Sequence, residues 1–211
     1  MKSAARVLAA CGALLGVFGL GLQYWLLYAD MSANGASALD VLWRFYAYFT
    51  LLTNTFVTVV FARAALKPDS LTGLNAPRVE LMAVTSIMFV CLVYNLLLAS
   101  RWDPQGWQKV ADVIVHNVVP LLFLLFWALR PHGGLKWGHA MFAAAWPLAY
   151  AVYGLTRGAF DGFYPYFFMD PTTASYAQIA LNLVGLVVAF MLGALLLIGI
   201  SRALGRRAPQ H

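Results

Sequence analysis

Two polar side chains inside otherwise apolar segments carry most of the chemistry that this sequence offers. Thr50 lies in the stretch YFTLLTNTFV, residues 48–57, and His116 is the one histidine well within an apolar segment. A threonine hydroxyl is a weak nucleophile until a base activates it, and imidazole is the commonest base near neutral pH. If their helices pack together, Thr50 and His116 form a nucleophile with its base.

Asp112 precedes His116 by four residues, so both side chains project from one face of a helix. A carboxylate at one imidazole nitrogen favours the tautomer in which the other nitrogen is basic. Ionisable residues at membrane depth are costly, which makes them candidates for function. A purely structural role, in which Asp112 and His116 hydrogen-bond across helices, explains the pattern equally well.

Several other polar side chains are candidates for supporting or substrate-binding roles. Membrane-helix threonines usually bond to their own helix and asparagines often join helices, so structural roles compete with functional ones throughout. Asn54 and Asn117 are candidate donors to an oxyanion. A cation near the outer end of a helix either extends to the lipid headgroups or receives a carboxylate from an amphiphilic ligand. The full set is Asp112, Asn54, Asn117, Arg44, Asn95, Asn182 and Arg157.

Composition makes the bilayer the solvent of this chain. Of 211 residues, 62% are hydrophobic and 10% are charged, and the mean hydropathy is +0.75. The net charge of +6 is scattered at the ends of apolar runs, which argues against a nucleic-acid partner. Cys11 and Cys91 both lie in apolar segments, so no disulfide framework is expected. No metal-ligand cluster or phosphate loop is recognisable, and no cofactor is expected.

Apolar runs of membrane-spanning length predict an all-α fold, a six-transmembrane-helix bundle forming a single domain over residues 1–211. Short polar joints connect the runs and are too small to fold separately. The predicted spans are Ala5–Tyr28, Val41–Ala65, Leu81–Ser100, Val110–Leu129, His139–Leu155 and Ala177–Ile200. On this scheme Thr50 lies about 15 Å and His116 about 10 Å below the outer ends of their helices.

Lysine and arginine gather at the segment ends on the side of the two termini, which predicts that both termini are cytoplasmic. The expected location is a bacterial inner membrane. Leu8–Cys11, LAAC, matches a lipoprotein cleavage box, but the apolar core follows Cys11 instead of preceding it. The segment is therefore predicted to be the first membrane helix, with Cys11 as a packing residue. Gly12, Gly16, Gly19 and Gly21 suit close helix contact.

The segment RGAFDGFYPYFFMDP, residues 157–171, is dense in aromatic residues. Aromatic side chains commonly form belts at membrane interfaces, and we expect this segment to be part of such a belt. A lid across the mouth of the bundle is the alternative.

Three segments together carry a resemblance to a known family. They are WRFYAYFTLLTN (residues 43–54), VHNVVPLLF (115–123) and RGAFDGFYPYFFMDP (157–171). In this order they resemble the androgen-induced-gene family of integral membrane hydrolases, and more closely its bacterial six-span members. The interval from His116 to Pro120 is one residue shorter than in the animal members.

The resemblance implies a threonine hydrolase of lipid esters, such as fatty acid esters of hydroxy fatty acids. Thr50 and His116 match the catalytic pair of that family. The expected partners are a lipid or fatty-acid ester substrate and the bilayer. A function of another class stays open, that of a small-molecule or lipid transporter or binding protein in which the same polar residues line a ligand or proton path.

Overall fold

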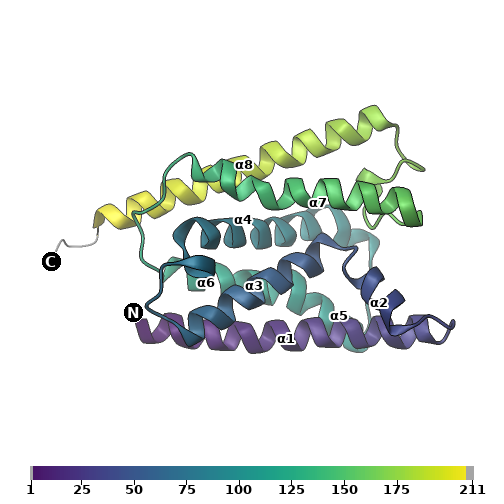
Figure 1. Cartoon of the computed structure of the whole chain (residues 1–211), viewed down its shortest axis with the longest axis horizontal. Helices are drawn as coiled ribbons and strands as arrows, with labels where there is room; N and C mark the ends of the chain where they lie inside the picture. Colours follow the sequence, from purple (N-terminus) through teal and green to yellow (C-terminus); the bar gives the residue numbers. More distant parts are fainter. Residues whose placement is uncertain (1, 208–211) are drawn as a thin grey trace.

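The computed structural model describes residues 2–207, and these residues fold into helices without a strand. Met1 and residues 208–211 of the predicted domain lie outside the described range. Figure 1 labels the α-helices. They are α1 (Lys2–Ser32), α2 (Ala38–Phe45), α3 (Phe49–Leu66), α4 (Pro77–Val93), α5 (Gly106–Val113), α6 (Val119–Ala128), α7 (His139–Asp161) and α8 (Tyr176–Arg207). Short helical turns are η1 (Gly73–Asn75), η2 (Tyr94–Leu98), η3 (Ala99–Arg101), η4 (Ile114–Val118) and η5 (Phe167–Met169).

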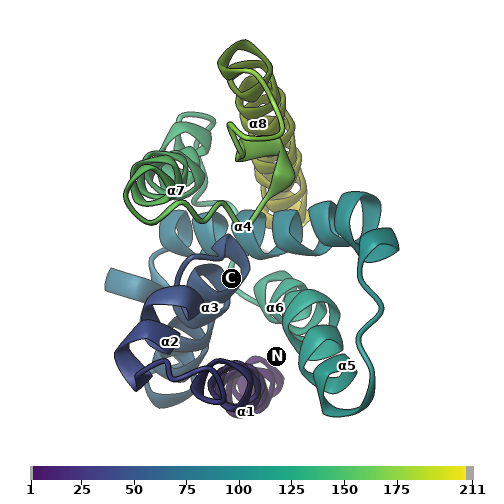
Figure 2. The ribbon, with the colours of Figure 1, turned by 90° about the vertical axis from the view of Figure 1, so that its right-hand side faces the viewer.

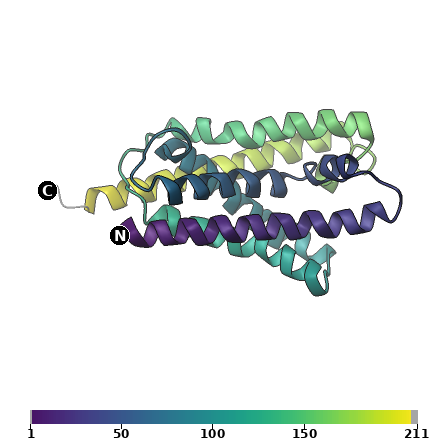
Figure 3. The same cartoon turned by 60° about the horizontal axis from the view of Figure 1, so that its bottom comes forward.

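Helix α4 is the central element of the bundle. It contacts α3 and α6 on one side and α7 and α8 on the other. Seen end on, α8 and α1 therefore lie on opposite sides of α4 (Figure 2). Helix α1 packs along α3, α5 and α6. The two described chain ends lie at the same end of the bundle (Figures 1 and 3), as an even number of antiparallel rods requires.

Within the described range, five segments are long and apolar enough to cross a membrane. They are Ser3–Ser32, Phe49–Leu66, Pro77–Arg101, Gly106–Ala128 and Tyr176–Arg206. Helix α7 is long enough but is not among them, and its sequence includes Trp146, Pro147, Tyr150 and Arg157. The helical bundle is thus as predicted, while a sixth membrane span, formed by α7, stays a prediction.

The predicted continuous helix Val41–Ala65 is wrong, because the chain breaks at Tyr46–Tyr48 between α2 and α3. The stretch contains no proline or glycine, and the contacts that support the break come from α7. The Tyr153 hydroxyl donates to the Tyr46 carbonyl (3.1 Å), and the Tyr150 hydroxyl donates to the Ala47 carbonyl (2.8 Å). These bonds satisfy backbone groups that would otherwise be costly in lipid.

The observed starts of α3 and α5 change where the two candidate residues lie along their helices. Thr50 is the second residue of α3, so a depth measured along one continuous helix does not apply. His116 lies ten residues beyond Gly106, where α5 begins, which corresponds to about 15 Å of helix instead of 10 Å.

A π-helical turn, η4, joins α5 to α6 and carries His116. Pro120 has no N–H and its ring conflicts with the carbonyl one turn earlier, which explains an irregular turn at this point. A second π turn, η2, extends α4 and carries Tyr94. Such turns are frequent at functional sites, and here each of the two contributes an aromatic ring to the same site.

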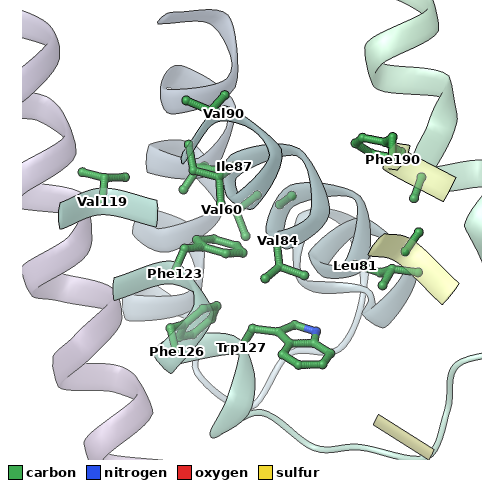
Figure 4. Close-up of a cluster of buried hydrophobic side chains, with 14 of the residues drawn as sticks. Val60, Leu81, Val84, Ile87, Val90, Val119, Phe123, Phe126, Trp127 and Phe190 are labelled. Carbon is green, nitrogen blue, oxygen red and sulfur yellow. The ribbon is translucent and has the colours of Figure 1, made fainter. Parts of the chain in front are cut away.

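The core around α4 is aliphatic and aromatic (Figure 4). Phe61 of α3 packs against Phe123 and Phe126 of α6, with ring centroids 4.8 Å and 5.3 Å apart. Ile87 and Val84 of α4 are fully buried beside them. This packing fixes α3 relative to α6, and with α6 the preceding turn η4.

Glycines of α1 bring that helix close to its neighbours, as predicted. A Cβ at Gly12 would lie 2.5 Å from the Phe61 ring, one at Gly16 would overlap the Thr58 side chain, and one at Gly19 would lie 2.5 Å from Ile114. Gly21 faces open space. The expectation that Cys11 packs between helices is wrong, because its side chain is exposed.

We expect Gly16→Ala to destabilise the bundle by about 1–3 kcal/mol, because the new methyl group forces α1 away from Thr58 of α3. Thermal unfolding in detergent measures the change. Gly21→Ala is the matched control, since it adds the same methyl group on the same helix with nothing within 4 Å. Equal shifts in melting temperature for both variants would contradict the close contact of α1 with α3.

Candidate functional site

Thr50, Asp112 and His116 line one cavity at the end of the bundle opposite the chain termini. This polar cavity has a volume of about 470 Å³. Its walls come from α1, the start of α3, η2 and η3, the α5–η4 rod, and the loop before α8. The tertiary structure therefore brings the predicted nucleophile, base and carboxylate to a common space.

The protonation of His116 follows from its neighbours. Its Nδ1 lies 3.0 Å from the backbone carbonyl oxygen of Asp112 and 3.1 Å from the carboxylate Oδ1 of Asp112. A carbonyl and an ionised carboxylate can only accept hydrogen bonds, so Nδ1 must carry the proton. In the neutral ring Nε2 then holds a lone pair, and no described residue occupies it with a hydrogen bond. His116 is arranged as a base at Nε2.

Tyr94 of η2 holds this pair in place. Its ring stacks on the His116 ring, with centroids 3.7 Å apart and planes inclined by 9°. Its hydroxyl donates to Oδ2 of Asp112 at 2.5 Å. The carboxylate is thus fixed by Tyr94 at one oxygen and by His116 at the other. Tyr94 was not among the residues predicted for the site, although its neighbour Asn95 indicated that polar groups face this depth.

Thr50 lies in the buried N-terminal turn of α3, next to Tyr166. The Thr50 backbone N–H donates to the Tyr166 hydroxyl at 3.4 Å, and that hydroxyl also interacts with the Thr50 side chain. Burial raises the pKa of Tyr166 to about 12, so its hydroxyl keeps its proton at physiological pH. Tyr166 is a neutral donor beside the candidate nucleophile.

The aromatic loop, defined as residues 157–171 from the end of α7 onward, contains Tyr166 and shows features of both predicted interpretations. Phe160 is 85% exposed, as a side chain of an interfacial belt would be. Pro165 and Tyr166 instead line the polar cavity, and Tyr166 and Met169 are buried. The middle of the loop therefore closes one wall of the site.

Asn54 joins two helices and does not line the polar cavity. Its Nδ2 donates to the Thr50 carbonyl (2.9 Å) and to the Val115 carbonyl (3.0 Å). In a π turn the Val115 carbonyl would accept from residue 120, but Pro120 has no N–H. Asn54 of α3 supplies the missing donor and so fixes Thr50 relative to His116. Both of its amide hydrogens are used, which leaves none for an oxyanion.

Asn95 and Asn117 pair with each other away from the cavity wall. Asn95 Nδ2 donates to Asn117 Oδ1 at 2.9 Å and to the Cys91 carbonyl at 2.8 Å. The pair links the π turn η2 to the π turn η4. Its contribution to the site is therefore to hold Tyr94 close to His116.

Three further candidates hold the neighbouring loop and α2, and none of them lines the polar cavity. Arg44 lies 3.6 Å above the Phe163 ring, and Asn182 donates to the Phe168 carbonyl at 3.0 Å. Arg157 is 3% exposed and pairs with Asp161, Nε to Oδ2 3.1 Å. Arg157 therefore does not extend to the headgroups, because it is held inside the protein by Asp161 and by the Trp43 ring, 4.2 Å away. A role toward a ligand carboxylate stays a prediction.

Arg101 and Asp30 are charged residues of the polar cavity wall that the sequence analysis did not single out. Arg101 also lies 4.1 Å from the centre of the Phe167 ring of the aromatic loop. Their position near the ends of apolar runs was the signal by which either residue could have been found.

A second, narrow pocket adjoins the polar cavity and is almost wholly apolar. Its volume is about 70 Å³, and its walls come from α4, α7, α8 and the aromatic loop. Thr50, Tyr94, Leu98 and Tyr166 belong to the walls of both spaces. The candidate nucleophile thus stands at the boundary between a polar space and an apolar one.

No protein-family model, no curated protein and no solved structure matches this chain. A function is therefore inferred from the geometry of the site. The resemblance to the androgen-induced-gene family stays a prediction.

We expect Asn54→Leu to destabilise the protein by about 2 kcal/mol, because the buried Val115 carbonyl loses its donor. Thermal unfolding in detergent measures the loss. Thr55→Val is the matched control, since Thr55 donates to the Leu51 carbonyl of its own helix and joins no second helix. A control as destabilised as Asn54→Leu would contradict the bridging role of Asn54.

Proposed function

We propose that this chain is an intramembrane acyl-ester hydrolase with Thr50 as nucleophile and His116 as general base. The observation that carries the proposal is the position of His116 Nδ1 between two acceptors, which leaves Nε2 basic in the cavity that Thr50 lines. Neither residue alone would argue for catalysis. A base of defined tautomer and a hydroxyl in one water-accessible space fulfil the minimum requirement for an activated nucleophile.

The reaction divides into two steps. Thr50 Oγ attacks the ester carbonyl carbon while Nε2 of His116 takes the hydroxyl proton. The carbon–alkoxy bond then breaks, the leaving alkoxide takes that proton, and an acyl-threonine forms. In the second step Nε2 takes a proton from a water molecule that attacks the acyl carbon. The bond to Thr50 breaks, Thr50 Oγ regains the proton and the carboxylic acid is released.

The surroundings suit the charges that develop in these steps. The Asp112 carboxylate lies beside Nδ1 and stabilises the imidazolium that forms when Nε2 takes a proton. The Tyr166 hydroxyl and the positive end of the α3 dipole lie beside Thr50, where the carbonyl oxygen becomes negative. Tyr166 takes the oxyanion role for which the sequence suggested Asn54 or Asn117.

Lipid esters are the substrate class that this location favours, because the site lies in a bundle of apolar helices and adjoins an apolar pocket. The resemblance to the androgen-induced-gene family points to the same residue pair and to fatty acid esters of hydroxy fatty acids. In the orientation that the basic residues predict, the protein lies in a bacterial inner membrane with cytoplasmic termini. The cavity then lies near the outer surface.

One observation favours a second candidate, a lipid or small-molecule transporter or binding protein without hydrolase activity. The break at Tyr46–Tyr48 leaves the N-terminus of α3 beside the polar cavity. Discontinuous helices that end at a central cavity are typical of substrate sites in transporters. Covalent labelling distinguishes the two functions, because transport and binding need no activated hydroxyl.

We expect a fluorophosphonate to form one covalent adduct on the purified wild-type protein, at Thr50, with loss of fluoride. Thr50→Ala removes the nucleophile and His116→Ala removes the base, so both variants should remain unlabelled. Intact-protein mass spectrometry followed by peptide mapping measures the adduct. Thr55→Val, a change five residues along α3, is the control and should label like the wild type.

Melting curves of the variants must show that they are folded, so that lost labelling reports on chemistry. A folded wild type without an adduct, or with an adduct at another residue, would contradict the hydrolase and direct attention to binding and transport assays.

We expect Asp112→Asn to lower the labelling rate by at least about tenfold and to change its dependence on pH. The new amide can donate to Nδ1 of His116, which favours the tautomer with a proton on Nε2. Labelling rates measured over a series of pH values give the result. Asp103→Asn, in the loop after η3, is the control, and an unchanged profile in Asp112→Asn would exclude a positioning role for Asp112.

A further inference from the structure

We propose that the narrow apolar pocket between α4, α7 and α8 holds the acyl carbons next to the ester carbonyl, and that its small volume selects among acyl groups. The alcohol side of the ester then lies in the polar cavity. This inference rests on the proposed function, since it takes Thr50 as the atom that meets the carbonyl. It adds the orientation of the substrate and the residues that select it.

Thr50 lies at the boundary between the polar cavity and the narrow apolar pocket. Thr50 and Tyr166 belong to the walls of both spaces, so an ester carbonyl at Thr50 has its two substituents directed into different surroundings. An ester has two such substituents, an acyl chain and an alkoxy group. The boundary between the two spaces therefore determines which end of the substrate goes where.

The side chains that line the two spaces determine which end of the ester each space accepts. The narrow pocket is formed by side chains such as Phe89, Ala151, Leu183 and Val187, which offer no hydrogen bond. Tyr150 also lines it, but its hydroxyl is used by the Ala47 carbonyl, so the phenyl ring is what it presents. An apolar chain gains free energy here, whereas an alcohol or a headgroup would lose its hydrogen bonds.

The polar cavity suits the alcohol end of the ester. It is larger, about 470 Å³ against about 70 Å³, and it carries Asp30, Arg101 and Gln108. These side chains can hydrogen-bond a polar alcohol, and the space has room for the water that the second step consumes. His116 lies on this side, where it meets both the leaving alcohol and the attacking water.

The narrow pocket also adjoins the part of the protein that lipid reaches most easily. Leu183 and Val187 belong to α8, of whose apolar window 17% is buried, the smallest share among the candidate spans of the described residues. Helix α8 stands on the outer side of α4 in the end-on view (Figure 2). The acyl group therefore lies beside the candidate span that the rest of the protein covers least. The substrate class that follows is an ester whose acyl group is apolar next to the carbonyl.

The test compares ethyl and hexadecyl fluorophosphonate on detergent-purified full-length protein. We expect Ala151→Phe to lower the labelling rate of the hexadecyl probe by about tenfold, the effect of excluding roughly two methylene groups from an apolar pocket. The ethyl probe should label this variant like the wild type. Val152→Phe is the matched control, because the adjacent side chain is 68% exposed on the outside of α7 and should change neither rate.

Val187→Phe fills the same pocket from α8 and guards against a misfolded first variant. Selective loss of hexadecyl labelling in either variant supports the acyl pocket. The acyl pocket would be overturned if Ala151→Phe and Val187→Phe both kept wild-type labelling rates with both probes, or lost the same fraction of the rate with each probe. Either result would leave the roles of Thr50 and His116 in place. A folded wild type that neither probe labels would instead overturn the proposed hydrolase.

Discussion

The hydrogen bond from Asn54 to the Val115 carbonyl connects the two halves of the candidate site. In a membrane each backbone carbonyl needs a donor from the protein, and Pro120 cannot supply one to the turn that precedes it. The π turn at residues 114–118 places His116, and the carbonyl that this turn leaves free is satisfied by a side chain of α3. The same side chain bonds to the Thr50 carbonyl. One amide therefore fixes the separation of nucleophile and base.

Side-chain hydroxyl groups likewise replace the missing helix hydrogen bonds at the break between α2 and α3. Two tyrosines of α7 donate to the carbonyls of Tyr46 and Ala47, and a tyrosine of the aromatic loop accepts from the Thr50 N–H. Three tyrosine hydroxyls thus compensate for the hydrogen bonds that an uninterrupted helix would have made. The result is a helix N-terminus, with its partial positive charge, inside the bundle and beside a polar cavity.

The site separates polar from apolar surroundings over a short distance. On one side Asp112, His116 and Tyr94 form a connected group of hydrogen-bonding and stacked side chains. On the other side the walls are aliphatic and aromatic, and the tyrosine hydroxyl of Tyr150 is already bonded. Such a boundary suits an amphiphile whose reactive bond lies between a chain and a polar group. The same boundary would also orient a ligand that is bound without being cleaved.

The sequence by itself determined the helical character of the chain, its apolar segments of membrane-spanning length, the close approach of α1 through its glycines, and Thr50 and His116 as the residues to examine. These conclusions follow from residue type and local spacing: apolar length predicts spans, small residues permit contact, and a histidine within an apolar run is costly. The tertiary structure decided the break before Thr50, the π turns, and the partners of Asn54, Arg157 and Tyr166. A polar residue signals that it needs a partner, but the partner's identity depends on helix packing, because Asn54 and Val115 are 61 residues apart.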